Sequence, residues 1–101
     1  MKLVIVTVVD AYKKDVINLF KQAEIKNFSN SDIEGFKTAV SGKIASNWFA
    51  SNSSGADSEM FFSFAKEEKI DELFKLIETF NEGLNTNNPL RAVVVPIERY
   101  I

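Results

Sequence analysis

Lys37 and Lys43 lie in GFKTAVSGKI, the stretch of this chain that comes nearest to a phosphate-binding loop. Such a loop places four residues between its glycines and follows the second with Lys and then Ser or Thr, whose hydroxyl reaches Mg²⁺. Here six residues separate Gly35 from Gly42, and Ile44 stands at the hydroxyl position. We therefore reject a phosphate loop. For the two lysines we retain a simpler prediction, which is contact with an anionic ligand. The alternative is that both are solvated surface charges.

Neither histidine nor cysteine occurs in the sequence, so the residues that most often act as general bases, nucleophiles and metal ligands are missing. Copper or zinc would find only Met1, Met60 and carboxylates, a poor set of ligands. Acids gather at residues 67–72, where the dipole of a predicted helix already explains them. We therefore predict no catalytic residue, no metal site, no cofactor and no enzymatic activity.

Composition limits the classes of protein to which this chain could belong. A length of 101 residues indicates a single domain over 1–101, and 46% hydrophobic with 26% charged residues is typical of a globular chain. A net charge of −2 argues against nucleic acid as a partner. No apolar run approaches the ~20 residues of a membrane span. LVIVTVV, which follows Met1 and Lys2, is read as a strand, not as a signal peptide, so we expect a cytoplasmic protein that is not inserted in a membrane.

Hydrophobic periodicity predicts six elements that would position these residues. Strands are expected at 2–9, 27–36, 59–66 and 90–97, and helices from about 11 to 24 and over 67–82. Asp10 is the expected N-cap of the first helix. The order predicts an α+β, ferredoxin-like βαββαβ sandwich, in which a four-stranded antiparallel sheet carries both helices on one face.

Three of the predicted strands are apolar on both faces. They are 2–9, 59–66 and 90–97, and the last of these reads as a buried strand would. Two helices can cover only one face of the sheet, so the other face needs a cover as well. A second chain is the simplest cover, and we therefore expect an oligomer.

The segment MKLVIVTVVDAYKKDVINLFKQAEI resembles the first strand and helix of the PII signalling proteins. NFSNSDIEGF resembles their second strand, which closes on a Gly-Phe pair, here Gly35-Phe36. SEMFFSFA, EEKIDELFKLIETF and VVVPIERYI then follow the strand, helix and strand order of that family. The chain is identified as a divergent PII-like protein with a shortened T-loop.

The resemblance implies a homotrimer with ligand sites in the clefts between subunits and a T-loop that contacts a membrane transporter or a metabolic enzyme. The ligand would be a small anionic metabolite or a nucleotide, bound by Gly35, Phe36, Lys37, Lys43 and Arg91. Two departures argue against standard ATP binding. Lys37 and Ala39 stand where the family has ligand-contacting Gly and Gln, and NEGLNTNNPLR replaces its glycine-rich TGKIGDGK turn, whose lysine only Arg91 could replace.

Trp48 and Phe49 stand in the polar segment between the second and third predicted strands. One interpretation has this pair docked within the oligomer, and the other has it anchoring a partner, as aromatic hot spots do. We predict a regulatory protein that binds a small metabolite or anion and acts on a transporter or enzyme through residues 37–57. Two alternatives stay open: a ferredoxin-like dimeric enzyme with a small cavity, which a buried hydroxyl of Tyr12 or Tyr100 would favour, and a purely structural oligomerisation module.

Overall fold

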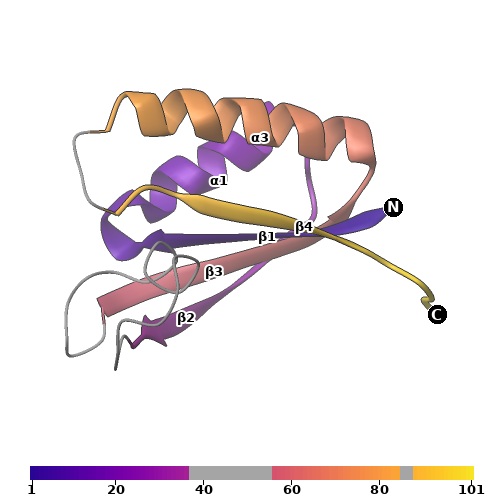
Figure 1. The fold of residues 1–101 in the computed structure, drawn as a ribbon, viewed down its shortest axis with the longest axis horizontal. Helices are drawn as coiled ribbons and strands as arrows, with labels where there is room; N and C mark the ends of the chain where they lie inside the picture. The colour runs from indigo at the N-terminus through magenta and orange to yellow at the C-terminus, as the bar shows by residue number, and fades with distance from the viewer. Residues whose placement is uncertain (37–55, 85–87) are drawn as a thin grey trace, which may run out of the picture.

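The computed structural model describes residues 1–36, 56–84 and 88–101. Four strands and two helices, with a short 3-10 turn before the first helix, form two layers (Figure 1). The elements are β1 (Lys2–Val9), η1 (Asp10–Tyr12), α1 (Lys13–Gln22), β2 (Ser29–Gly35), β3 (Ala56–Ala65), α3 (Glu67–Glu82) and β4 (Arg91–Pro96). This arrangement confirms the predicted ferredoxin-like α+β class.

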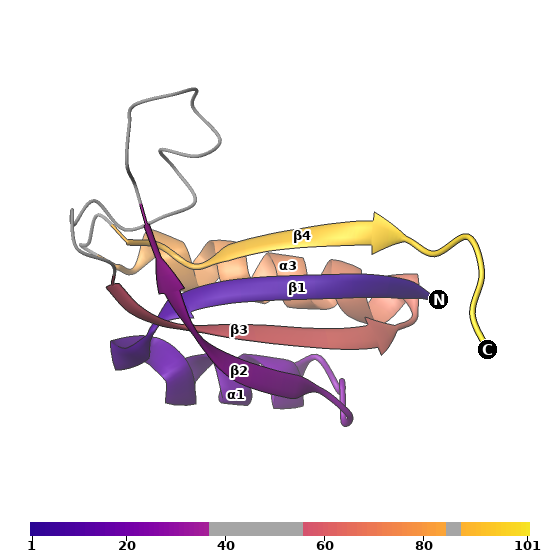
Figure 2. The same ribbon diagram turned by 90° about the horizontal axis from the view of Figure 1, so that it is seen from below.

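The sheet has the order β2-β3-β1-β4, and every neighbouring pair is antiparallel. β1 is therefore a central strand, as its continuous run of β-branched residues predicts. β2 and β4 form the two edges. Both helices cover the same face, and turning the molecule shows the other face of the sheet in front of them (Figure 2).

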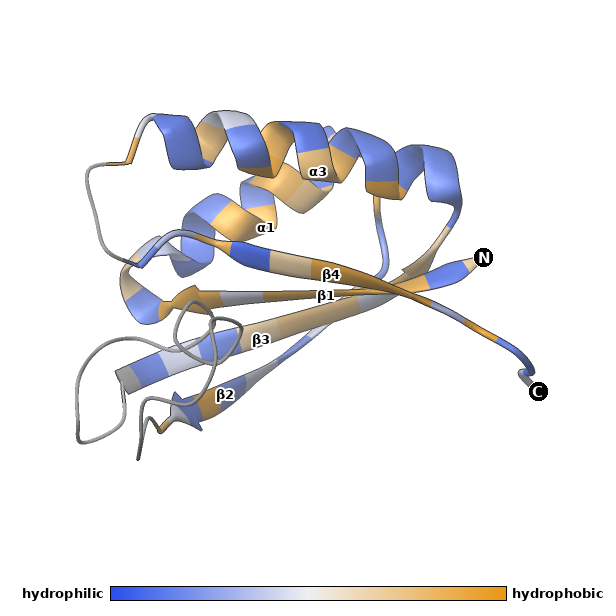
Figure 3. Cartoon of the chain, in the orientation of Figure 1, coloured by the Kyte–Doolittle hydropathy of each residue, from blue (hydrophilic) through white to orange (hydrophobic). Residues whose placement is uncertain are grey.

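The core lies between the helices and the covered face. Val4, Val6 and Val8 point into it from β1, and Phe61 and Ala65 from β3, because alternate residues of a strand face the same side. The rings of Phe20 and Phe28 stack with centroids 4.7 Å apart. The helices contribute buried apolar stripes of Val16, Leu19 and Phe20 from α1 and Ile70, Leu73 and Ile77 from α3, and both stripes face the sheet (Figure 3).

Apolar side chains also line the opposite face, where neither helix reaches. Phe64 is 57% exposed, and Val93 and Val95 are 38% and 40% exposed. The register places Phe64 and Val95 on either side of Leu3, and Phe62 and Val93 on either side of Ile5. We call these six residues the open apolar face.

Three expectations about the strands need correction. β3 begins at Ala56, earlier than residue 59, because Ala56 and Asp57 pair with Gly35 and Glu34. The predicted loop 37–57 is therefore shorter, and its residues 37–55 lie outside the described part. β4 is an edge strand with Val93, Val94 and Val95 exposed, so an all-apolar stretch did not indicate burial within one chain. Pro96, the last residue of β4, fits an edge because it cannot donate to a neighbouring strand.

The first helix also begins differently. Asp10 opens a 3-10 turn, and α1 follows from Lys13 with no side-chain cap at its start. The expectation that Asp10 caps the helix was wrong. Its carboxylate takes part instead in a group of charged side chains described below.

Replacing a core leucine tests the assignment of the covered face. Leu73 is fully buried, so Leu73→Ala should lower the free energy of unfolding by about 2–5 kcal/mol, from lost burial and the cavity left behind. Lys75→Ala, at an exposed position of the same helix, should change it by less than about 0.5 kcal/mol. Urea unfolding followed by circular dichroism measures both, and equal effects would contradict the assigned core.

Candidate functional site

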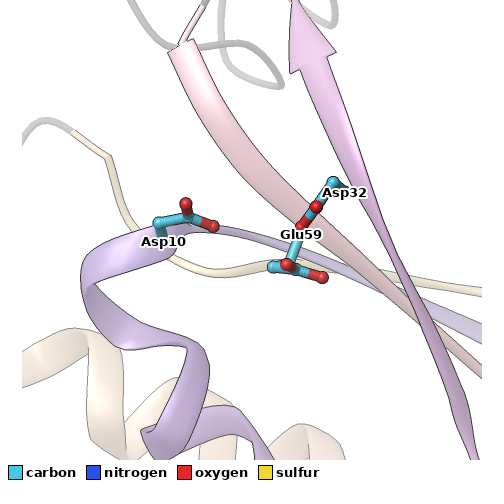
Figure 4. A group of neighbouring side chains, drawn as sticks. All are labelled: Asp10, Asp32 and Glu59. Atoms are coloured by element: carbon cyan, nitrogen blue, oxygen red, sulfur yellow. The ribbon is translucent and has the colours of Figure 1, made fainter.

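Three carboxylates from different elements meet at one end of the sheet. Asp10, Asp32 and Glu59 each bring an oxygen to within 4.8 Å of the others (Figure 4). Asp10 follows β1 directly, and Asp32 lies opposite Glu59 in the pairing of β2 with β3. Cross-strand partners point to the same face, so the register itself brings Asp32 and Glu59 together.

Glu59 is the centre of this group and is only 1% exposed. One of its oxygens accepts a hydrogen bond from Asn30 Nδ2 at 2.9 Å, and the other lies 3.3 Å from Lys13 Nζ. Lys13 belongs to the start of α1 and Asn30 to β2. One buried carboxylate thus links a helix and two strands. Among the residues that the structure describes, no buried side-chain nitrogen or oxygen lacks a hydrogen-bond partner.

The pKa values of the two facing carboxyls are shifted in opposite directions. The hydrogen bond with Glu59, and next the repulsion from its charge, raise the pKa of Asp32. The hydrogen bond from Asp32, then that from Asn30, lower the pKa of Glu59, while burial acts in the other direction. Two carboxyls this close titrate as a pair, and the first proton to bind is shared between them.

This arrangement can hold a proton or a positive charge. Three carboxylate oxygens at such a spacing usually need a cation beside them. Here the ammonium of Lys13 contacts Glu59 and compensates part of this charge. We assign no metal to it.

A hollow of about 570 Å³ opens beside the group and is lined by Asp10, Asp32, Ile33, Glu34, Asp57 and Ser58. Four of these six residues are acidic. An anionic ligand would be repelled there, so this hollow does not suit the anion predicted from the sequence.

The predicted ligand residues occupy two separate places in the described part of the chain. Gly35 is buried at the end of β2, and Phe36 beside it is 55% exposed. Arg91 begins β4 at the other edge of the sheet, opposite Thr7. Paired hydrogen bonds of Asn81 with Leu90, at 3.0 and 2.9 Å, hold the backbone just before Arg91. Lys37, Lys43, Trp48 and Phe49 lie outside the described residues.

The two tyrosines give little support to the enzyme alternative. Tyr12 packs edge-on against Phe80, with ring centroids 6.0 Å apart, and Tyr100 is 84% exposed. A buried hydroxyl in a closed cavity would have favoured that alternative, and Tyr100 does not supply one.

Sequence analysis missed the carboxylate group. Asp32 and Glu59 belong to strands whose boundaries were only approximate, and a shift of one residue would move either side chain to the other face. The available signal was an acid inside a strand rich in aromatic residues, as at Glu59 in SEMFFSFA. Such a residue, once buried, requires partners.

The antiparallel four-stranded sheet with both helices on one face defines a ferredoxin-like protein. Within that class, comparison with solved structures shows the PII-like fold. CPII, a nitrogen regulatory PII-like protein from Thiomonas intermedia K12, matches with a TM-score of 0.62 and 16% identity over 99% of this chain and 94% of its own. A DUF3240 family protein from Shewanella baltica OS155 matches with a TM-score of 0.67 and 16% identity over 98% and 91%.

The chain therefore has a divergent PII-like fold, as its sequence predicts. No protein-family model and no curated protein matches the sequence. No helix in the described ranges is long and apolar enough to cross a membrane. The structure of CPII was determined with ADP, AMP and bicarbonate bound.

Removing the ammonium beside Glu59 tests the charge network. Lys13→Met should lower the free energy of unfolding by about 1–2 kcal/mol, discounted because Lys13 is partly exposed. The pKa of Glu59 is lowered by folding, so its stabilising contribution is present above the unfolded-state pKa and is lost as pH falls through the folded pKa. The penalty should therefore be largest near neutral pH and shrink in acid.

Lys14→Met is the matched control, since Lys14 is the next residue and is exposed. Denaturant unfolding of both variants over a pH series gives the comparison. Equal penalties for the two variants, or a penalty that persists unchanged in acid, would contradict the network.

Proposed function

We propose that this chain is a non-enzymatic, PII-like regulatory protein that forms a homotrimer. It binds a small anionic metabolite or a nucleotide in the clefts between subunits, and it acts on a membrane transporter or a metabolic enzyme through residues 37–57. The open apolar face, on a PII-like fold, is the observation that carries this proposal. Two helices cannot cover both faces of this sheet, so copies of the chain must share the second one.

Several features support the oligomer. Apolar residues fill the middle of the open face, with half-buried Leu3, Ile5 and Phe62 beside exposed Phe64. Contiguous apolar surface of this kind marks an interaction site. β4 adds Val94 on the other side of the same edge strand, and an edge exposed on both faces invites pairing with another chain.

The position of the ligand residues supports a site between subunits. Gly35 and Phe36 end β2 at one edge, whereas Arg91 begins β4 at the other, with β3 and β1 between them. One copy cannot bring them around one small molecule. A ring of copies can place the β2 edge of one subunit beside the β4 edge of the next, because a head-to-tail contact uses two different surfaces. CPII, with nucleotides and bicarbonate bound, sets the ligand classes to test.

Light scattering after gel filtration tests the assembly. We expect a mass three times the 11.4 kDa of one chain. Phe64→Asp would place a charge inside the proposed interface and should yield a monomer with an unchanged circular dichroism spectrum. Thr79→Asp introduces the same charge at an exposed position of α3 and should leave the trimer intact. A monomeric wild-type protein would overturn the proposal.

Thermal stability in the presence of AMP, ADP, 2-oxoglutarate and bicarbonate tests the ligand. A ligand at about 100 times its dissociation constant should stabilise the native state by about 2.7 kcal/mol. Arg91→Ala should abolish the shift in melting temperature, while Lys21→Ala, an exposed cation of α1, should retain it. A trimer that responds to none of these compounds would favour the structural oligomerisation module.

A further inference from the structure

Two pairs of acids face each other in succession where β2 ends and β3 begins. The register sets Asp32 opposite Glu59 and Glu34 opposite Asp57. Residues two apart on a strand point to the same face, so all four side chains lie on the side of the sheet that carries the helices. Like charges directly opposite each other weaken strand pairing.

Among the residues that the structure describes, the surrounding elements compensate this charge only in part. Lys13 of α1 contacts Glu59 at 3.3 Å, and Asn30 of β2 donates a neutral hydrogen bond to it. η1 contributes a further acid, Asp10. β1 contributes Val8 opposite Glu59 and no charge. Five carboxyls therefore share this end of the sheet, and the contacting cation, Lys13, is bound to the innermost of them.

We propose that the facing acids form a pH-sensitive latch, which closes the end of the β2–β3 ladder when Asp32 and Glu59 share a proton and loosens it when both of these carboxyls are ionised. The device stands on the register and on the contacts of Glu59. It does not depend on the trimer or on a bound ligand, so it can fail while the proposed function holds, and the reverse is also true.

The effect of pH has a defined sign. Folding raises the pKa of Asp32, because its protonated carboxyl bonds to Glu59 and its ionised form faces a second negative charge. The stability from this group is therefore present at low pH and is lost as pH rises through the folded pKa. Folding lowers the pKa of Glu59, whose contribution is lost in strong acid. The latch is tightest in mild acid, where one proton serves both groups.

The loosening should be local. The contacts of Asn30 and Lys13 with Glu59 do not require Asp32 to be charged or neutral. Beyond Asp32 only three residue pairs remain, at Ile33, Glu34 and Gly35, opposite Ser58, Asp57 and Ala56. These last pairs contain the second acid pair and no cation, so they should open first.

Amide hydrogen exchange of the full chain tests the latch. Protection factors, corrected for the intrinsic rate at each pH, would be measured from about pH 4 to about pH 8. Residues 31–35 and 57–59 should lose protection as pH rises across this range, because folding raises the pKa of Asp32. The β1–β4 ladder, which carries no facing acids, serves as the internal reference and should stay constant. High salt should reduce the loss by screening the carboxylates.

Two variants separate local repulsion from net charge. Asp32→Asn with Asp57→Asn removes one acid from each pair and should abolish the pH dependence at residues 31–35. Asp71→Asn with Glu72→Gln removes the same charge from exposed positions of α3 and should keep the wild-type profile. Protection at these residues that follows the β1–β4 reference at every pH would overturn the latch, and so would equal flattening by both double variants. Comparing residues 31–35 with the β1–β4 ladder in the wild-type protein tests the latch even if the first double variant does not fold.

Discussion

The structure depends on one constraint: the sheet is apolar on both faces, and the two helices can cover only one. On the covered face, the alternate valines of β1 and Phe61 of β3 meet the stripes of α1 and α3 and exclude water. On the other face, equivalent side chains line the same strands without cover. The free energy gained by burying apolar area is of similar size per residue on either face, so the second face remains available to drive association. A small domain gains from such sharing because it buries a limited fraction of its own surface.

The second constraint is electrostatic and acts at one end of the sheet. A buried carboxylate such as Glu59 seldom adds stability compared with an apolar residue, since losing its hydration costs as much as its ion pair returns. Its contacts give it another role. Lys13 of α1 and Asn30 and Asp32 of β2 bind one side chain of β3, which fixes how β2 lies against β3 and α1. Among the described residues, the acids here outnumber the contacting cations, so the stability of this end of the sheet is sensitive to protons.

Periodicity in the sequence was enough to predict the element order and the class of fold. The 67–82 helix matches α3 at both ends, and the run at 2–9 matches β1, because a long apolar stripe and a β-branched run each have a single low-energy solution. The start of β3 could not be predicted, since Ala56 and Asp57 are ordered by pairing with β2 and not by their own propensity. The apolar run in β4 was misleading for a related reason. Apolar side chains indicate that a strand will be buried, but they do not indicate whether the same chain or another copy covers it. The carboxylate group required the strand register, which no local pattern encodes.

Fold similarity at 16% identity leaves function to be argued from particular residues. Under the proposed function, the cleft between subunits is the first place to look for a ligand. Strand order separates Gly35 and Phe36 from Arg91 by the full width of the sheet, so these residues can serve one ligand only if they come from different copies. Association would then do two things at once, covering the apolar face and completing the binding site. The acidic hollow beside Glu59 stands apart from both, because its charge repels the anions that such a cleft would hold.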